Sequence, residues 1–474
     1  MKESSKLQKN LARLPAVDEL LRKTEMQPLL KRFPRKLVVD SIRLELNAIK
    51  KQVVAENLQV DEIFSLSLFF AHLAETLEMQ MAPRLKRVIN ATGVVIHTNL
   101  GRSPLPMAAL EQANAIACRY SNLEYNLESG CRGIRYDNLE ALLCRLTGAE
   151  AAMVVNNNAG AVLLVLSALA AGREVIISRG EMIEIGGAFR IPEVITQGGA
   201  ILREVGTTNR THPADYERAI NAETALILKV HTSNYRVSGF TSAVDSVELV
   251  KLAKQFSLPV IEDLGSGCMM DLSAYGVGGE PTVRQVVKTG VGIVTFSGDK
   301  LVGGPQAGIV VGRRDLIEQV KRHPLNRALR IDKLTLTFLE EVLKCYLDEE
   351  KAVSSLPTLA MLTMSLAELR RRANRLKGQI HRQLGNISGI SLTVQEGISR
   401  AGGGALPMVE IPTWLVALQV HNHSASALER FFRSRSLPII TRILDDQLIF
   451  DPRTLFADDG PEIARACGDF LKQL

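Results

Sequence analysis

One stretch of the chain reads Gly292-Ile-Val-Thr-Phe-Ser-Gly-Asp-Lys300-Leu-Val-Gly-Gly-Pro-Gln-Ala-Gly308. It begins as a short apolar, β-branched run, breaks into small residues that carry one lysine, and returns to an apolar run at 309–311. This pattern predicts a strand, a tight turn and a second strand. Glycines let a ligand approach the backbone, and a lysine amine held there can be desolvated until it becomes nucleophilic. The alternative is a solvated lysine in an ordinary hairpin.

A second segment, Leu258-Pro-Val-Ile-Glu-Asp263-Leu-Gly-Ser-Gly267, has the pattern of a buried strand that ends in an acid and a glycine loop. An aspartate on one strand and a lysine in a turn beyond it are the pair that pyridoxal 5'-phosphate requires. The lysine holds the aldehyde as a Schiff base, and the carboxylate keeps the pyridine nitrogen protonated so that the ring accepts electrons. Alternatively, Asp263 only caps its turn. Taken together, Asp263 and Lys300 favour the cofactor.

The composition is that of a globular chain, since 46% of the 474 residues are hydrophobic and 23% are charged. This length predicts two or three domains. The longest largely apolar run, 159–171, is too short to span a membrane, and the polar N-terminus lacks the apolar segment of a signal peptide. Six cysteines without a C-x-x-C pair argue against a zinc site or a disulfide framework. These features predict a cytoplasmic protein without a metal site.

The formal net charge of +6 is unevenly distributed. Residues 1–60 contain thirteen basic and seven acidic residues, which leaves 44 of each sign in the rest of the chain. A basic segment joined to a neutral remainder suggests a polyanionic partner, and nucleic acid is the leading candidate. The alternative is a solvated helical surface, because the excess is modest.

Apolar periodicity divides the chain into three parts. Residues 1–82 read as short helices separated at Pro15, Pro28 and Pro34, followed by a longer helix at 60–81 that serves as a linker. Residues 83–340 alternate strands with helices, which predicts an α/β core with a mostly parallel sheet. Residues 341–474 read as a C-terminal α+β domain. The strands expected in the core are 153–155, 174–178, 225–230, 259–261 and 293–296, and those expected in the C-terminal domain are 390–394, 415–420 and 448–450.

Further polar groups are expected at the carboxyl ends of the core strands, where α/β sheets bind ligands. Asn157, Asn158 and Ala159 follow a strand and open an apolar helix, whose backbone N–H groups suit the cofactor phosphate. Ser297 can add a hydroxyl donor to the same phosphate. His231 ends another strand and can stack on the cofactor ring or donate a hydrogen bond to it. The alternatives are an ordinary asparagine cap and a structural histidine.

Three arginines lie near turns: Arg102, Arg327 and Arg330. The planar guanidinium group suits bidentate contact with a tetrahedral oxyanion. Composition alone does not select these three, because surface arginines are common. The basic run at 369–375 is better explained as a solvated helix face than as a binding site.

Several long motifs resemble bacterial selenocysteine synthase, the L-seryl-tRNA(Sec) selenium transferase family. The resemblance covers essentially the whole chain. Among the motifs are His97-Thr-Asn-Leu-Gly-Arg-Ser-Pro104, Leu127-Glu-Ser-Gly-Cys-Arg-Gly-Ile-Arg135, Glu204-Val-Gly-Thr-Thr-Asn-Arg-Thr-His212, Glu262-Asp-Leu-Gly-Ser-Gly267 and Thr295-Phe-Ser-Gly-Asp-Lys300.

The resemblance implies a fold type I pyridoxal 5'-phosphate enzyme in which Lys300 is the Schiff-base lysine and Asp299 takes part in the chemistry. Arg102, Arg327 and Arg330 match the family's anion-binding arginines, where selenophosphate docks. The N-terminal helices resemble the domain that recognises the selenocysteine tRNA, tRNA(Sec). The family assembles as a ring-shaped homodecamer, a pentamer of dimers, with active sites at subunit interfaces.

The implied reaction converts seryl-tRNA(Sec) to selenocysteinyl-tRNA(Sec). Lys300 removes the α-proton, Asp299 or Lys300 protonates the leaving hydroxide, and selenium from selenophosphate adds to the resulting aminoacrylyl-tRNA. Two alternatives stay open. One is a pyridoxal enzyme acting on a free amino acid or amino sugar, such as a lyase or a desulfurase that uses Cys268. The other is a catalytically inactive RNA-binding or scaffold protein.

Overall fold

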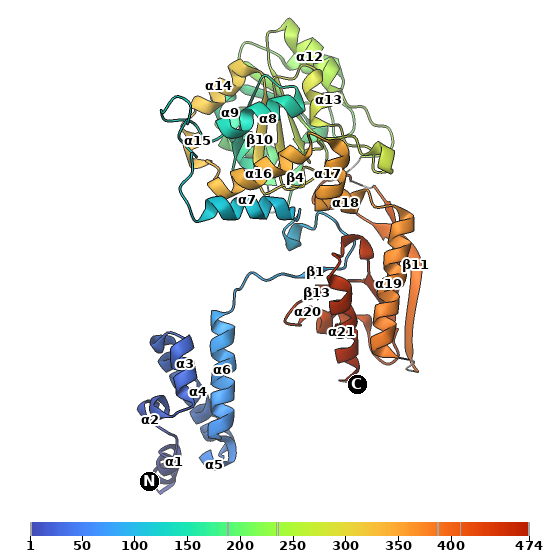
Figure 1. Ribbon diagram of the computed structural model, residues 1–474. Coiled ribbons are helices and arrows are strands. Elements are labelled where there is room, and N and C mark those ends of the chain that lie inside the picture. The colour runs from blue at the N-terminus through green and yellow to red at the C-terminus, as the bar shows by residue number, and fades with distance from the viewer. Residues whose placement is uncertain are drawn as a thin grey trace. The chain divides into compact units, whose positions relative to one another are not determined.

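The computed structural model describes residues 2–186, 189–233, 235, 237–385, 388–407 and 409–472. The chain divides into two compact units, Met1–Arg87 and Val88–Leu474. Figure 1 traces both units, with the first in blue.

The first unit is built from helices whose apolar stripes face one another. On α4 and α6, Val38, Ile42, Leu73 and Leu77 have no exposed surface and belong to one apolar cluster. Side chains at helix spacing therefore supply the core that the periodicity predicts. The bounds are α1 (Lys2–Leu11), α2 (Val17–Arg22), α3 (Met26–Arg32), α4 (Arg35–Glu56), α5 (Val60–Ile63) and α6 (Leu66–Met81).

Two details of this unit differ from the sequence prediction. Pro28 lies inside the first turn of α3 instead of separating two helices, a position where a helix loses no hydrogen bond to proline. The helix expected at 60–81 is interrupted at Phe64 and Ser65, where both backbones are extended. Its longer part, α6, buries an apolar face within the unit.

A seven-stranded sheet organises the second unit, in the order β2-β10-β9-β8-β7-β3-β6. Only β10 runs antiparallel to its neighbours, so the mostly parallel α/β sheet expected from the sequence is confirmed. The bounds are β2 (Ala151–Val155), β3 (Glu174–Ser178), β6 (Ile201–Val205), β7 (Thr224–Val230), β8 (Val260–Gly265), β9 (Ile293–Ser297) and β10 (Gly308–Gly312).

Alternate residues of these strands belong to two different apolar clusters, because successive side chains point to opposite faces of a sheet. In β2, Ala152 and Val154 join one cluster, whereas Ala151, Met153 and Val155 join the other. Helices cover both faces (Figure 1). Their bounds are α7 (Met107–Ala117), α8 (Asp137–Thr147), α9 (Asn158–Ala170), α10 (Ile191–Gln197), α11 (Pro213–Ala219), α12 (Ser246–Gln255), α13 (Val283–Lys288), α14 (Arg314–Arg322), α15 (Leu325–Ala328), α16 (Lys333–Cys345), α17 (Glu349–Ser355) and α18 (Pro357–Leu362).

A second, antiparallel sheet follows, in the order β11-β12-β15-β14. Helices α19 and α21 lie side by side against it (Figure 1). Strand β1, at the start of this unit, pairs with β13 beside this sheet. The bounds are β1 (Ile89–Asn90), β11 (Ile390–Ser399), β12 (Ile411–Val420), β13 (Ile439–Ile440), β14 (Arg442–Leu444), β15 (Gln447–Phe450), α19 (Leu366–Leu384), α20 (Ala425–Arg433) and α21 (Asp459–Leu471). Two short strands, β4 (Glu184–Ile185) and β5 (Phe189–Arg190), form a separate pair.

Candidate functional site

The candidate site lies where β8 and β9 end. The two strands are parallel, and Asp263 of β8 pairs in register with Thr295 of β9. Strand β9 ends at Ser297, and β10 returns antiparallel from Gly308, which pairs with Ser297. The predicted strand, turn and strand around Lys300 are therefore present, and they bring the lysine to the end of the sheet where ligands bind in α/β folds.

The amine of Lys300 is enclosed by the loops at this edge. The residue is only 4% exposed. A Cβ atom built on Gly265 would lie 3.9 Å from Nζ of Lys300, so the missing side chain of Gly265 leaves room beside the amine. Burial lowers the pKa of Lys300, and the negative charge of Asp263 offsets this effect only partly. The amine is therefore shifted toward the neutral form, in which a lysine is nucleophilic.

Asp263 is a buried carboxylate whose hydrogen bonds converge on one oxygen. Its Oδ1 atom accepts from Asn158 Nδ2 at 2.8 Å, from Thr295 Oγ1 at 3.0 Å and from Gly265 N at 3.1 Å. Burial nevertheless raises the pKa of Asp263. A carboxylate that is 2% exposed is stabilised in its charged form by a cation close to it, such as a protonated ring nitrogen.

The start of α9 reaches Asp263 through Asn158. The side-chain Oδ1 of Asn158 is buried without a hydrogen-bond partner among the described residues, which leaves one acceptor facing the site unused. Ala159 lies in the first turn of α9, where backbone N–H groups lack intrahelical acceptors. The Oδ1 atom of Asn157 instead accepts from Gly160 N at 2.8 Å, so this side-chain oxygen caps the helix.

His231 follows β7 and joins a buried network. Its backbone N–H donates to the carbonyl of Asp263 at 2.9 Å, and Nε2 lies 3.0 Å from Oε2 of Glu280. Glu280 also accepts from Ser266 Oγ at 2.8 Å and from Leu406 N at 2.9 Å. The network connects the loops after β7 and β8 to the segment before β12. Beside His231, a cavity of about 350 Å³ opens between the loops after β3, β6 and β7.

Arg102 and Asp299 form an ion pair next to Lys300. Nη1 of Arg102 donates to Oδ2 of Asp299 at 2.7 Å. The hydroxyl of the next residue, Ser103, donates to the carbonyls of Asp299 and Lys300 at 2.9 and 2.8 Å. The loop that carries Arg102 is thus fastened to the turn that carries the lysine.

The other two predicted arginines lie near the end of β2. The backbone of Arg330 pairs with Val155, and its side chain forms an ion pair of 3.2 Å with Glu124. Arg330 lines a cavity of about 150 Å³ together with Arg135 and Glu124. Arg327 is exposed on α15, and its side chain has no hydrogen bond or ion pair within the described part of the chain. Among the described residues, Arg102 shares no hydrogen-bond or ion-pair partner with these two arginines.

Ser297 is buried at the end of β9, and its hydroxyl has no hydrogen bond to any described residue. Sequence reasoning missed Thr295, Ser103 and Glu280. The alternation of β9 places Thr295 on the face that Asp263 reaches, which is a readable signal. Glu280 lies in an irregular segment between η3 (Ser273–Tyr275) and α13, and nothing in its local sequence distinguishes it.

The described residues do not favour a cysteine nucleophile, a metal site or a membrane-spanning helix. Burial raises the pKa of Cys268 to about 12, and its thiol donates to the carbonyl of Met270, so it is a poor nucleophile. Within the described ranges, no cluster of three or more His, Cys, Asp or Glu side chains is arranged to hold a metal ion. No helix in those ranges is both long and apolar enough to cross a membrane.

Sequence comparison places this site in a known context. Residues 88–456 match the family described as L-seryl-tRNA selenium transferase, and residues 11–49 match the one described as selenocysteine synthase N terminal. The chain is 50% identical over 455 residues to an L-seryl-tRNA(Sec) selenium transferase of Geobacter sulfurreducens, and 52% identical to that of Geobacter metallireducens. Each alignment covers 96% of this chain and 98% of the relative.

Comparison with solved structures supports the fold type I assignment that the sequence motifs imply. The structure of D-glucosaminate-6-phosphate ammonia-lyase superposes with a TM-score of 0.58 at 21% sequence identity. The match covers 84% of this chain and 98% of the other. At this level of identity the likeness concerns the fold alone.

Proposed function

The chain belongs to the L-seryl-tRNA selenium transferase family, and we propose that it converts seryl-tRNA(Sec) to selenocysteinyl-tRNA(Sec) with selenophosphate as the selenium donor. The observation that carries the proposal is the buried amine of Lys300 beside Asp263, at the carboxyl ends of two parallel strands. The relatives aligned over nearly the whole chain are named for this activity.

Pyridoxal 5'-phosphate is the cofactor, and the residues present fit it. Lys300 offers an amine whose pKa is lowered by burial, and Asp263 offers a buried carboxylate suited to a protonated ring nitrogen. The unpartnered Oδ1 of Asn158 and the N-terminus of α9 at Ala159 supply further polar groups. In this assignment Asn157, Ser297 and His231 complete the cofactor's surroundings.

When bound, the cofactor supplies an aldehyde that bonds to amines and a ring that accepts electrons from the α-carbon. Lys300 is then the base that removes the α-proton of the seryl group, because burial favours its neutral form. Asp263 holds a proton on the ring nitrogen. Asp299 and Lys300 are both buried, and they are the two candidates for protonating the leaving hydroxide.

The selenium donor is an anion, and we assign its binding to Arg102, Arg327 and Arg330. Arg102 is already held beside the lysine turn by Asp299. Arg327 is exposed and has no ion pair among the described residues, so its guanidinium is available to a ligand. In the assembly we propose, a homodecamer built as a pentamer of dimers, active sites lie at subunit interfaces.

Recognition of tRNA(Sec) is assigned to the N-terminal helical domain. The basic excess of the chain lies in residues 1–60, and residues 11–49 match the N-terminal family of selenocysteine synthases. We propose three functional parts: residues 1–82 for tRNA binding and linkage, 83–340 for the cofactor core and 341–474 for the small domain. A cytoplasmic location accords with a tRNA substrate.

The direct test supplies the purified holoenzyme with seryl-tRNA(Sec) and selenophosphate and follows selenium incorporation into the aminoacyl-tRNA. The expected result is conversion of seryl-tRNA(Sec) and not of seryl-tRNA(Ser). Lys300→Ala should abolish both turnover and the visible absorbance of the cofactor bonded to lysine. Retention of that absorbance in the variant would refute the role of Lys300.

Removal of residues 1–80 separates the alternatives. A lyase or desulfurase acting on a free amino acid would keep its activity, whereas a tRNA-dependent enzyme should lose its substrate. A gel shift of tRNA(Sec) against tRNA(Ser), with and without these residues, measures the loss directly. A purified protein without cofactor absorbance would point to the inactive RNA-binding alternative.

A further inference from the structure

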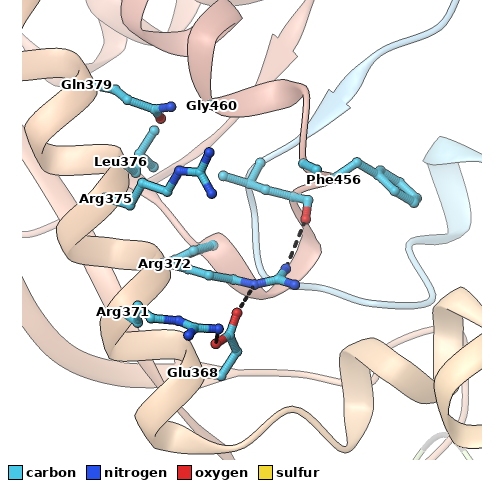
Figure 2. A pocket seen from close by; sticks show the side chains of 11 residues that line it. Glu368, Arg371, Arg372, Arg375, Leu376, Gln379, Phe456 and Gly460 are labelled. Carbon is cyan, nitrogen blue, oxygen red and sulfur yellow. Dashed lines mark hydrogen bonds and ion pairs between the residues drawn. The ribbon is translucent and has the colours of Figure 1, made fainter.

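A basic pocket lies between α19 and the start of α21, on the small domain of the second unit. Its cavity of about 460 Å³ is within the range of small-ligand sites. Figure 2 shows side chains from α19 on one wall and the segment around Phe456 and Gly460 on the other. The residues that line it are Glu368, Arg371, Arg372, Arg375, Leu376, Gln379, Pro452, Leu455, Phe456, Ala457 and Gly460.

The charges of this pocket are only partly compensated. Glu368 accepts from Arg372 Nε at 2.9 Å and pairs with Arg371, so a single carboxylate serves two guanidinium groups. Arg372 also donates to the carbonyl of Leu455 at 3.4 Å, which fixes it against the opposite wall. The side chain of Arg375 points into the pocket (Figure 2), and its guanidinium has no hydrogen bond or ion pair with the residues that the structure describes.

The close spacing of these arginines has a physical consequence. Arg371 and Arg375 are four residues apart on one helix, and like charges at that spacing repel. Helix α19 carries six Lys or Arg residues and one Glu, whereas the chain beyond residue 60 has equal numbers of Lys or Arg and of Asp or Glu. An anion bridging Arg371 and Arg375 would relieve the repulsion, and the guanidinium fork matches phosphate oxygens.

We propose that this pocket binds a backbone phosphate of RNA, as a second contact for the tRNA outside the N-terminal helices. The proposal rests on the proposed function for the identity of the RNA. The pocket has room for more than a bare ion, and its open rim at the exposed Arg371 admits a polymer. Phosphate contacts position an RNA without reading its sequence, so the pocket would contribute affinity and not tRNA identity.

The test measures RNA binding by the full-length holoenzyme at several salt concentrations, using fluorescence anisotropy. The probes are a tRNA(Sec) transcript and an oligouridylate. Arg375→Ala should weaken binding of both probes roughly threefold to tenfold and reduce the slope of log K against log salt by about 1. Arg382→Ala is the matched control, because Arg382 is exposed on the same helix and does not line the pocket.

The outcomes separate the inference from the proposed function. If Arg375→Ala binds both probes with the affinity and salt slope of Arg382→Ala, the pocket inference is overturned, whatever the enzyme's activity. A change in self-association without a change in RNA binding would also overturn it, in favour of a contact between copies of the chain. If the tRNA(Sec) transcript is not bound tightly but oligouridylate still depends on Arg375, the inference stands and the proposed tRNA specificity fails.

Discussion

The Nε2 atom of His231 lies 3.0 Å from Oε2 of Glu280, and this bond ties the end of β7 to a segment distant in sequence. Burial lowers the pKa of His231, but the hydrogen bond and charge of Glu280 outweigh it, so the net shift is upward. Burial raises the pKa of Glu280, but its bond to His231 and its two other donors leave the net shift downward. Both directions describe an ion pair beside the cofactor site.

The replacement Glu280→Gln should change how the free energy of unfolding depends on pH, compared with the unchanged protein. A raised histidine pKa stabilises the fold below its unfolded value of 6.5, and this stabilisation is lost as pH rises through the folded pKa. The lowered pKa of Glu280 stabilises the fold above 4.5, and this is lost as pH falls. The free energy of unfolding of the variant should therefore fall most between pH 4.5 and pH 6.5, by about 1–3 kcal/mol, and fall less at alkaline pH.

Thermal unfolding of the unchanged protein and of Glu280→Gln across the pH range measures this difference in stability. Ser266→Ala serves as the control, because it removes one neutral donor to Glu280 and leaves the ion pair in place. Its loss of stability should vary little with pH. A loss in Glu280→Gln that is equally independent of pH would show that His231 is not charged in the fold.

Asp263→Asn should preserve the fold and impair catalysis. The amide oxygen of asparagine can still accept the hydrogen bonds that reach Oδ1, but the negative charge that holds a proton on the cofactor ring is lost. We expect turnover to fall roughly a hundredfold or more, because a charged hydrogen bond is replaced by a neutral one. Turnover and the spectrum of the bound cofactor are the measurements.

Thr295→Val is the matched comparison for Asp263→Asn. It removes one neutral donor to the same oxygen without changing the charge, and Asn158 and Gly265 still donate. A loss of less than about tenfold is expected. Full activity in Asp263→Asn would exclude the carboxylate from the electronic role assigned to it.

Local patterns explain why the centre of the site could be predicted from sequence. The β9–turn–β10 hairpin and β8 have buried, β-branched runs bounded by glycines, and the carboxyl ends of parallel strands meet at one edge. The sequence therefore predicts that Lys300 and Asp263 lie at one edge of the sheet, and in the structure the charge of Asp263 acts on the Lys300 amine. Strand β6 escaped prediction because it alternates weakly at the sheet edge, where Ile201 is 51% exposed.

Contacts distant in sequence explain what could not be predicted. Glu280 acquires its role from His231 and Leu406, which lie 49 and 126 residues away in the chain. The local sequence pattern around Glu280 cannot predict contacts with residues so distant in the chain. Asn157 shows the opposite problem, because a pattern typical of phosphate binding also fits the helix cap that its Oδ1 atom makes.

Gly308→Ala should disturb the start of α9. A Cβ atom at position 308 would lie 2.1 Å from the carbonyl oxygen of Asn157 and 2.9 Å from the amide nitrogen of Asn158. Both are backbone atoms, so β10 or the start of α9 must shift. We expect a loss of about 1–3 kcal/mol in the free energy of unfolding, together with weaker cofactor binding. Denaturant unfolding and cofactor titration measure the two effects.

Gly378→Ala is the same chemical change as Gly308→Ala, but it should raise the free energy of unfolding instead of lowering it. Gly378 lies within α19, and a Cβ atom there would meet nothing within 4 Å. Alanine should stabilise the helix by about 0.5–1 kcal/mol. Equal effects of the two replacements would contradict the close approach of β10 to the start of α9.

Arg102→Lys tests whether the arginine beside Asp299 binds the selenium donor. Arginine can donate from one edge of its planar guanidinium to Asp299 and from another edge to an anion. Lysine keeps the positive charge but lacks this planar group, so it should hold the two partners at once less well. We expect the KM for selenophosphate to rise about tenfold, equivalent to one lost charged hydrogen bond, with little change in the KM for seryl-tRNA(Sec). Steady-state kinetics with each substrate varied in turn distinguish the two constants.

Arg313→Lys is a matched control for this replacement. Arg313 also pairs with an aspartate, since its Nη2 atom lies 2.6 Å from Oδ2 of Asp315, but this pair is exposed at the start of α14. Exposed ion pairs contribute little, so neither KM should change. If Arg102→Lys behaves like Arg313→Lys, the guanidinium of Arg102 serves only to fasten its loop to Asp299, and the anion must be held by other residues. A rise confined to the selenophosphate KM assigns the free edge of that guanidinium to the donor.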